Sequence, residues 1–150
     1  MLFPTAALFA DDQSAPVHFG RTNPNAGLFP DSSIVDFSYL QDKPAGKHGF
    51  LATSPEGKFV WKNGRRARFW GVNISNKSLW VGKNVIDRVV DTLAHSGANM
   101  VRFEAIDSTG GLLDSTDPNS SRTIDKQKLE TLDYWVYRLK ERGIYYYLDL

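Results

Sequence analysis

Two charged residues that could bind a ligand or support catalysis lie inside one short apolar segment of this 150-residue chain, residues 98–106. On a strand, Arg102 and Glu104 would share one face with Met100, while the residues between them, with Ala105, would face the opposite way and pack on helices. An arginine on an interior face needs an anionic partner, because an unpaired buried charge is costly and a guanidinium fits a carboxylate. Arg102 is therefore predicted to hold a carboxylate, either in a functional site or in a structural ion pair with Glu104.

Three further polar residues are candidates because they lie at or just beyond the ends of predicted strands. Asn73 and Asp149 lie near the ends of the apolar segments on either side, and Asp107 opens the loop that follows Glu104. Each also has an ordinary explanation, since Asn and Asp commonly form turns and bond nearby backbone groups. The candidates for substrate binding or active-site support are Asn73, Arg102, Glu104, Asp107 and Asp149.

Composition excludes several classes of function. The chain is 41% hydrophobic and can bury a core, while 18 Lys and Arg balance 17 Asp and Glu, so it offers no broad basic field for nucleic acid. The absence of cysteine excludes thiol nucleophiles, disulfides and Cys-ligated zinc. The histidines are isolated and are expected to be ordinary surface or packing residues: His18, His48 and His95. We expect neither a metal nor an organic cofactor.

The elements that must position the candidates begin with two hairpins in series. Apolar segments at 50–53 and 58–61 flank a Pro-Glu-Gly turn, and an Asn-Gly turn at 63–64 leads into the segment 65–74. Asn-Gly between alternating apolar runs is a strong hairpin signal, because both residues tolerate positive φ. The end of that segment, 71–74, is predicted to be the first strand of the main sheet.

Two helices are predicted to alternate with the strands. Apolar residues recur at helical spacing over 85–94, with Gly97 placed as a left-handed cap. A second helix should start at the N-cap Asp125 and end at residues 140–143. Its residues expected to be buried are Leu129, Leu132, Trp135, Val136 and Leu139. The helix charges expected to be solvated are Asp87, Arg88, Lys126, Lys128, Glu130 and Arg138.

The order of elements predicts an α/β fold with a parallel sheet. Strands at 71–74, 98–106 and 144–150 alternate with the two helices, as in βαβ units. A doubly wound nucleotide-binding fold would carry a glycine-rich phosphate turn after its first strand, and this sequence has none. The long loop at 107–124 instead favours a (β/α)8 barrel, whose sites are built from loops at the carboxyl ends of its strands. The hairpins would then close the amino end.

Length indicates that the chain is the first part of such a barrel. A barrel of this kind needs about 250 residues, and three parallel strands with two helices cannot cover both faces of a sheet. We divide the chain into a leader at 1–33, an extended segment with a hairpin cap at 34–66, and a truncated barrel at 67–150. Residues 1–10 are apolar, too short for a membrane span, and are similar to the tail of a secretory signal without its charged start. Secretion or a periplasmic location is the corresponding expectation.

Several sequence motifs resemble those of a known enzyme family. Residues 57–60 (GKFV), the Asn-Gly turn and 68–73 (RFWGVN) are similar to the entry into the barrel of family-5-type, cellulase-like glycoside hydrolases. The segment 97–103 (GANMVRF) resembles their second strand, and 125–150 resembles their second helix and third strand. Residues 35–51 also resemble the leader of large bacterial members. The resemblance covers roughly residues 34–150.

The resemblance implies hydrolysis of β-linked polysaccharides or oligosaccharides by two glutamates with retention of configuration, which needs carboxyl groups about 5 to 5.5 Å apart. In the family these glutamates come from the fourth and seventh strands, so none of the carboxylates here is expected to be catalytic and the segment alone should be inactive. The family's arginine matching Arg102 holds the nucleophile. Glu104 and Asp107 stand where relatives carry histidine and aspartate near the sugar, so Glu104 departs from the pattern.

Two alternative functions remain open at the level of sequence. One is a barrel-like module that binds carbohydrate without cleaving it, and a weaker one is a nucleotide-binding domain. The aromatic residues could serve the first, because Trp70 and Trp80 are candidates to stack on a sugar, although core packing is the usual role of a strand tryptophan. Core packing is likewise the expectation for Tyr145, Tyr146 and Tyr147.

Overall fold

The structure, a computed structural model, describes residues 36–108, 110–113 and 122–149. The predicted leader at 1–33 and His18 lie outside the described residues. The elements in chain order are η1 (Ser38–Leu40), β1 (Leu51–Thr53), β2 (Phe59–Trp61), β3 (Gly71–Ser75), η2 (Asn76–Ser78), α1 (Lys83–Ser96), β4 (Met100–Glu104), α2 (Lys126–Arg142) and β5 (Tyr145–Leu148).

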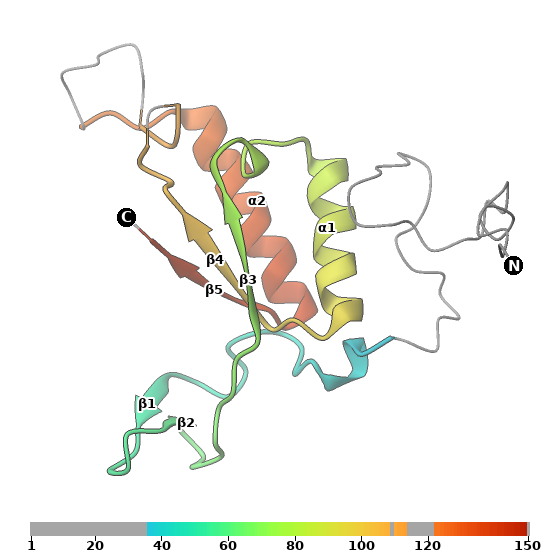
Figure 1. Ribbon diagram of the computed structural model, residues 1–150, viewed down its shortest axis with the longest axis vertical. Helices are drawn as coiled ribbons and strands as arrows, with labels where there is room; N and C mark the ends of the chain where they lie inside the picture. The colour runs from blue at the N-terminus through green and yellow to red at the C-terminus, as the bar shows by residue number, and fades with distance from the viewer. Residues whose placement is uncertain (1–35, 109, 114–121, 150) are drawn as a thin grey trace, which may run out of the picture.

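A three-stranded parallel sheet, in the order β3-β4-β5, forms the centre of the molecule. Both helices lie on one of its faces (Figure 1). The predicted α/β order is confirmed, and this arrangement is compatible with the first part of a (β/α)8 barrel. The described residues form no closed barrel.

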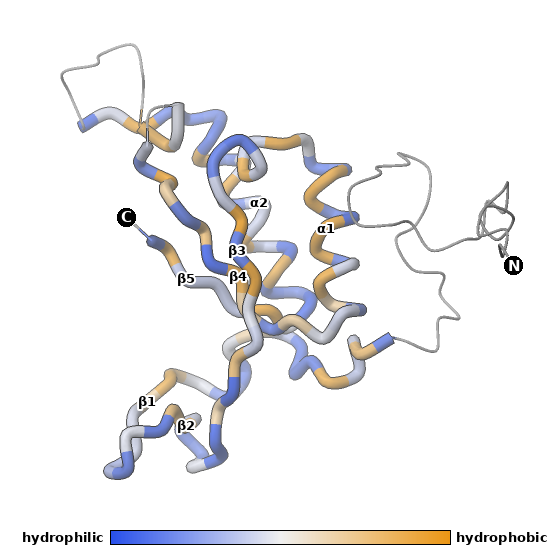
Figure 2. Tube along the Cα trace, viewed as in Figure 1, coloured by the Kyte–Doolittle hydropathy of each residue, from blue (hydrophilic) through white to orange (hydrophobic). Residues whose placement is uncertain are grey.

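The core lies between the sheet and the helices, because alternation along β4 turns Val101 and Phe103 toward them, both fully buried. The Phe103 ring lies 6.0 Å from the ring of Trp135 on α2, whose indole N–H donates to the Leu79 carbonyl at 2.8 Å. Figure 2 shows apolar residues along the side of α1 that faces this layer. Ala105, expected on the same face, has a positive φ of 57° and lies beyond the end of the strand.

The helix boundaries confirm the predicted caps. The Asp125 side chain accepts hydrogen bonds from the backbone N–H groups of Gln127 (2.9 Å) and Lys128 (3.1 Å). Each helix ends at a glycine in the left-handed conformation, Gly97 (φ 82°) and Gly143 (φ 78°). These two positions need glycine because a Cβ is strained at such φ values.

Two of the helix expectations are wrong. Leu129 was expected to be buried and is 38% exposed, in the first turn of α2. The charges of Asp87 and Arg138 were expected to be solvated, yet they form an ion pair of 2.7 Å between α1 and α2. The Tyr134 hydroxyl donates to the same carboxylate at 2.8 Å. Asp87 and Arg138 therefore belong to the contact between the helices, while Lys126 and Glu130 are exposed as expected.

The β1–β2 hairpin lies at the amino ends of the parallel strands, as predicted (Figure 1). The second hairpin is short and is marked by a single bridge between Val60 and Arg66. The rings of Trp61 and Phe69 pack on Tyr145, the first residue of β5, with centroid separations of 5.1 Å and 5.6 Å. This aromatic cluster attaches the hairpin to the sheet.

Several aromatic residues expected in the core are exposed. Trp70 is 59% exposed, Tyr146 44% and Tyr147 53%. Trp70 precedes the sheet at its amino end, while the two tyrosines lie on β5, an edge strand of the described sheet. In the part of the chain that the structure describes, no further layer covers these positions.

Candidate functional site

A row of polar side chains crosses the face of the sheet opposite to the helices. Because Val101 and Phe103 take the helix side of β4, the alternation places Arg102 and Glu104 on the other side. The parallel register sets Asn73 of β3 opposite Arg102. Glu104 is the last residue of β4 and Asp149 directly follows β5, while Asn73 and Arg102 lie in the middle of their strands. The row therefore runs from the middle of the sheet to its carboxyl end.

The row is connected by direct contacts. The Arg102 Nη2 group donates to the Asp149 carboxylate, and the same nitrogen lies 3.7 Å from Glu104 Oε1. The other oxygen of Glu104 accepts a hydrogen bond from the Asn73 side-chain amide. Four of the five candidates from the sequence, on three different strands, therefore form one continuous polar network.

The contacts within this network favour the charged form of Arg102. The hydrogen bond to Asp149 raises the pKa of Arg102 above its ordinary value; burial opposes this rise, and the charges of Asp149 and Glu104 add to it. Two carboxylates flank one guanidinium, and all three side chains are 30% to 46% exposed. The network is thus an open, charged surface that a polar ligand can reach. The ion pair between Arg102 and Glu104 that the sequence suggested is present at 3.7 Å. Asp149, however, is the nearer partner of Arg102.

Asp107, the fifth candidate, lies apart from the row. Its side chain is exposed and forms no hydrogen bond or ion pair with the described residues. The chain turns sharply between them: Ala105 has a positive φ, and the Leu112 N–H donates to the Ile106 carbonyl at 2.6 Å. Gly111 is needed here, since a Cβ would lie 2.3 Å from the Ile106 oxygen. The compact turn separates Asp107 from the network.

The two tryptophans considered for sugar stacking have different settings. Trp80 is half-buried against the core, and the Lys128 ammonium lies 5.8 Å from its ring centroid. Trp70 lies at the amino end of the sheet, where its backbone N–H donates to the Asn99 side-chain oxygen at 2.7 Å. Trp70 therefore lies at the opposite end of the strands from the row.

Histidines and acidic residues do not assemble into a metal centre in the described ranges, where no group of three potential ligands occurs. His48 contacts Asp42 at 3.0 Å, and His95 lies 3.8 Å from Asp36. Within the same ranges, none of the helices has the length and apolar character to cross a membrane.

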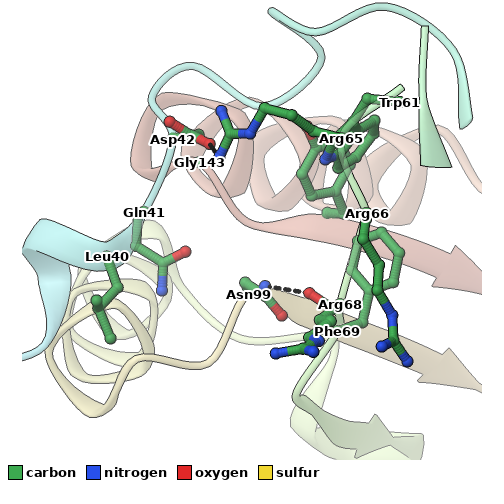
Figure 3. A pocket seen from close by; sticks show the side chains of 11 residues that line it. Leu40, Gln41, Asp42, Trp61, Arg65, Arg66, Arg68, Phe69, Asn99 and Gly143 are labelled. Carbon is green, nitrogen blue, oxygen red and sulfur yellow. Dashed lines mark hydrogen bonds and ion pairs between the residues drawn. The ribbon is translucent and has the colours of Figure 1, made fainter. Parts of the chain in front are cut away.

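Reasoning from the sequence missed a second polar region, a hollow of about 370 Å³ at the amino end of the sheet (Figure 3). It lies between the segment 40–42 and the segment 61–69, with Asn99, Gly143 and Tyr145 between them. The signal that could have found it is the run Arg65-Arg66-Ala67-Arg68 after the Asn-Gly turn.

Comparison with solved structures reveals a likeness to a glycoside hydrolase family 5 protein from Bacteroides vulgatus. The TM-score is 0.56 and the sequence identity 21%, over 72% of this chain and 25% of that one. The likeness is one of fold. No protein-family model matches the sequence. The search of curated proteins likewise found no match.

The match covers only part of the family 5 structure. The chain spans about a quarter of the length of the family 5 structure. The matched fold is compatible with the barrel architecture expected from the sequence motifs. Glu104 and Asp149 lie at the carboxyl ends of their strands, the end of the sheet at which (β/α)8 barrels build their sites.

Proposed function

We propose that the chain forms the amino-terminal part of a retaining glycoside hydrolase barrel that acts on β-linked polysaccharides or oligosaccharides. The observation that carries this proposal is the row Asn73–Glu104–Arg102–Asp149, which runs from the middle of the parallel sheet to its carboxyl end. The family 5 fold likeness supports it. The two catalytic glutamates would belong to strands that follow β5 in the complete protein, and 1–33 would be an export leader.

Arg102 has a defined role in this proposal. Its Nη2 group is engaged by Asp149, whereas Nη1 and Nε form no hydrogen bond to any residue the structure describes. The guanidinium can therefore offer these donors to a second carboxylate, that of the nucleophile. A cation beside that carboxylate favours its ionised form, which is the form that attacks the sugar.

The remaining members of the row would position Arg102 and meet the substrate. Glu104 and Asp149 both contact the Nη2 nitrogen of Arg102, which restricts the rotation of the guanidinium. Asn73 holds the Glu104 carboxylate in turn. Carboxylate and amide groups suit sugar hydroxyls because they accept and donate hydrogen bonds. Asp107, exposed at the start of the following loop, would contact the sugar from outside the row.

The test is to express the complete reading frame that contains this sequence and to assay soluble β-glucans and mannans. We expect hydrolysis, with the product's anomeric configuration retained when followed by proton NMR. Hydrolysis with inversion would contradict the mechanism. Saturable binding of a glucan without any cleavage would contradict the enzymatic proposal in favour of a carbohydrate-binding barrel.

A further inference from the structure

The amino-end hollow carries a concentration of positive charge. Three guanidinium groups, Arg65, Arg66 and Arg68, line it together with a single carboxylate, Asp42. Figure 3 shows Arg65 extending toward Asp42, whereas the side chains of Arg66 and Arg68 extend in other directions from the same segment. All three arginines are exposed at their side chains, so solvent ions can reach them.

The one carboxylate is already shared among other cations. Asp42 contacts Lys47 at 3.0 Å and His48 at 3.0 Å, while Arg65 lies at 3.9 Å, the longest of its contacts. Hydrogen bonds from Lys47 and His48 lower the pKa of Asp42, so the carboxylate is ionised at neutral pH. Arg66 and Arg68 have no ion pair with any described residue. The hollow therefore keeps an excess of positive charge.

The backbone that carries the arginines is held in place. The Trp61 N–H donates to the Arg65 carbonyl at 2.8 Å, and the Ala67 N–H donates to the Phe59 carbonyl at 2.8 Å. The Asn99 side chain donates to the Arg68 carbonyl at 2.9 Å. Ala67 is buried at 6% exposure, which leaves its neighbours to face outward. Only the side chains need to adjust when an anion enters, which lowers the cost of binding.

We infer that this hollow binds a divalent oxyanion, a sulfate or phosphate group that is either free or attached to a saccharide. Guanidinium groups donate paired N–H bonds whose spacing matches two oxygens of such a group. The hollow lies at the opposite end of the strands from Arg102 and Asp149, so this inference is independent of the proposed glycosidase function. An oxyanion here would tie the 61–69 segment to the sheet.

The experiment titrates the 150-residue chain with sodium sulfate, and separately with phosphate, against sodium chloride at equal ionic strength. Proton–nitrogen NMR follows the amides of residues 65–69, Asn99 and the Trp61 indole. We expect saturable shifts at these positions that chloride does not produce. A third titration uses a sulfated disaccharide: a tighter dissociation constant than for sulfate identifies a saccharide-borne group, and an equal one identifies the free ion.

The decisive variant is Arg66→Gln/Arg68→Gln, which we expect to weaken sulfate binding by at least about tenfold. Its matched control is Lys77→Gln/Lys126→Gln, which removes the same charge from two exposed residues at the carboxyl end of the sheet. Equal weakening in both variants, or shifts that follow ionic strength alone, would overturn the inference. If the arginine variant does not fold, the residues whose NMR signals shift in the unaltered chain provide the test. Shifts centred on Asn73 and Arg102 would then overturn the inference.

Discussion

The Arg102 guanidinium on β4 donates to the carboxylate of Asp149, which lies 47 residues further along the chain and directly after β5. The contact exists because the two strands are parallel neighbours, with Arg102 in register with Tyr147. Residues two apart on a strand face the same way, so Asp149 lies on the Arg102 side of the sheet. The pair joins the candidate site across the strands.

Replacing Arg102 by lysine tests its role in the complete protein. A lysine keeps the charge but loses the fork that engages Asp149 with one nitrogen and leaves others for a second carboxylate. We expect kcat/KM on a soluble β-glucan to fall by more than about tenfold, with little change in the thermal unfolding midpoint. Arg68→Lys, at the amino end of the strands, is the control and should keep full activity. Unchanged activity in Arg102→Lys would remove Arg102 from the site.

Removing the N-cap of α2 should destabilise the chain. Asp125 accepts two backbone hydrogen bonds from the first turn, which alanine cannot replace. We expect Asp125→Ala to lower the free energy of unfolding by about 0.5 to 2 kcal/mol, measured by urea denaturation. Asp133→Ala, at an exposed position inside the same helix, is the control. Equal losses in the two variants would mean that the cap adds nothing beyond a surface carboxylate.

Backbone conformation and close packing both favour glycine at position 143, which ends α2. Comparing substitutions at Gly143 and Gly46 separates the two effects. Gly143 has a φ of 78°, and a Cβ there would lie 3.0 Å from the Asp42 carbonyl oxygen. Gly46 has a φ of 90° with no atom within 4 Å of that position. Gly46→Ala should cost about 1 kcal/mol from backbone strain alone, and Gly143→Ala should cost at least about 1 kcal/mol more. Equal unfolding free energies would show that the close approach relaxes freely.

Stability should depend on the ionisation of Asp42 in acid. Hydrogen bonds from Lys47 and His48 lower its pKa below the ordinary 3.8, so the unfolded chain binds a proton more readily than the folded chain. The stabilisation is fully present above pH 3.8 and is lost as the pH falls through the folded pKa. Carbon NMR of the Asp42 carboxyl should give a midpoint below 3.8, and Lys47→Gln should move it upward. A midpoint at or above 3.8 in the unaltered chain would refute this.

Local elements were largely predictable because their signals are local. The Asn-Gly turn, the apolar spacing of 85–94, the caps at Asp125 and Gly97 and the end of the second helix at 140–143 each depend on a few neighbouring residues, and the structure confirms them. Burial was less predictable. Leu129 and Trp70 carry the same apolar signal as core residues, yet their exposure depends on which layer lies over them.

The candidate site, too, was predictable in its residues but not in its contacts. Strand alternation placed Arg102 and Glu104 on one face, the predicted strand ends pointed to Asn73 and Asp149, and the family resemblance supported Arg102 and Glu104. Tertiary structure decided that these four touch one another while Asp107 does not, since strand register and the turn after Ala105 set those distances.

The sequence by itself determined the order of elements, their ends and the residue types that face away from the helices, because these depend on interactions between near neighbours in the chain. Only the tertiary structure decided that Asp149 rather than Glu104 is the nearer partner of Arg102, that Asp87 and Arg138 join the two helices, and that three arginines line a hollow with Asp42. Each of these contacts joins distant parts of the chain, and their pairing follows from how strands and helices stack in space.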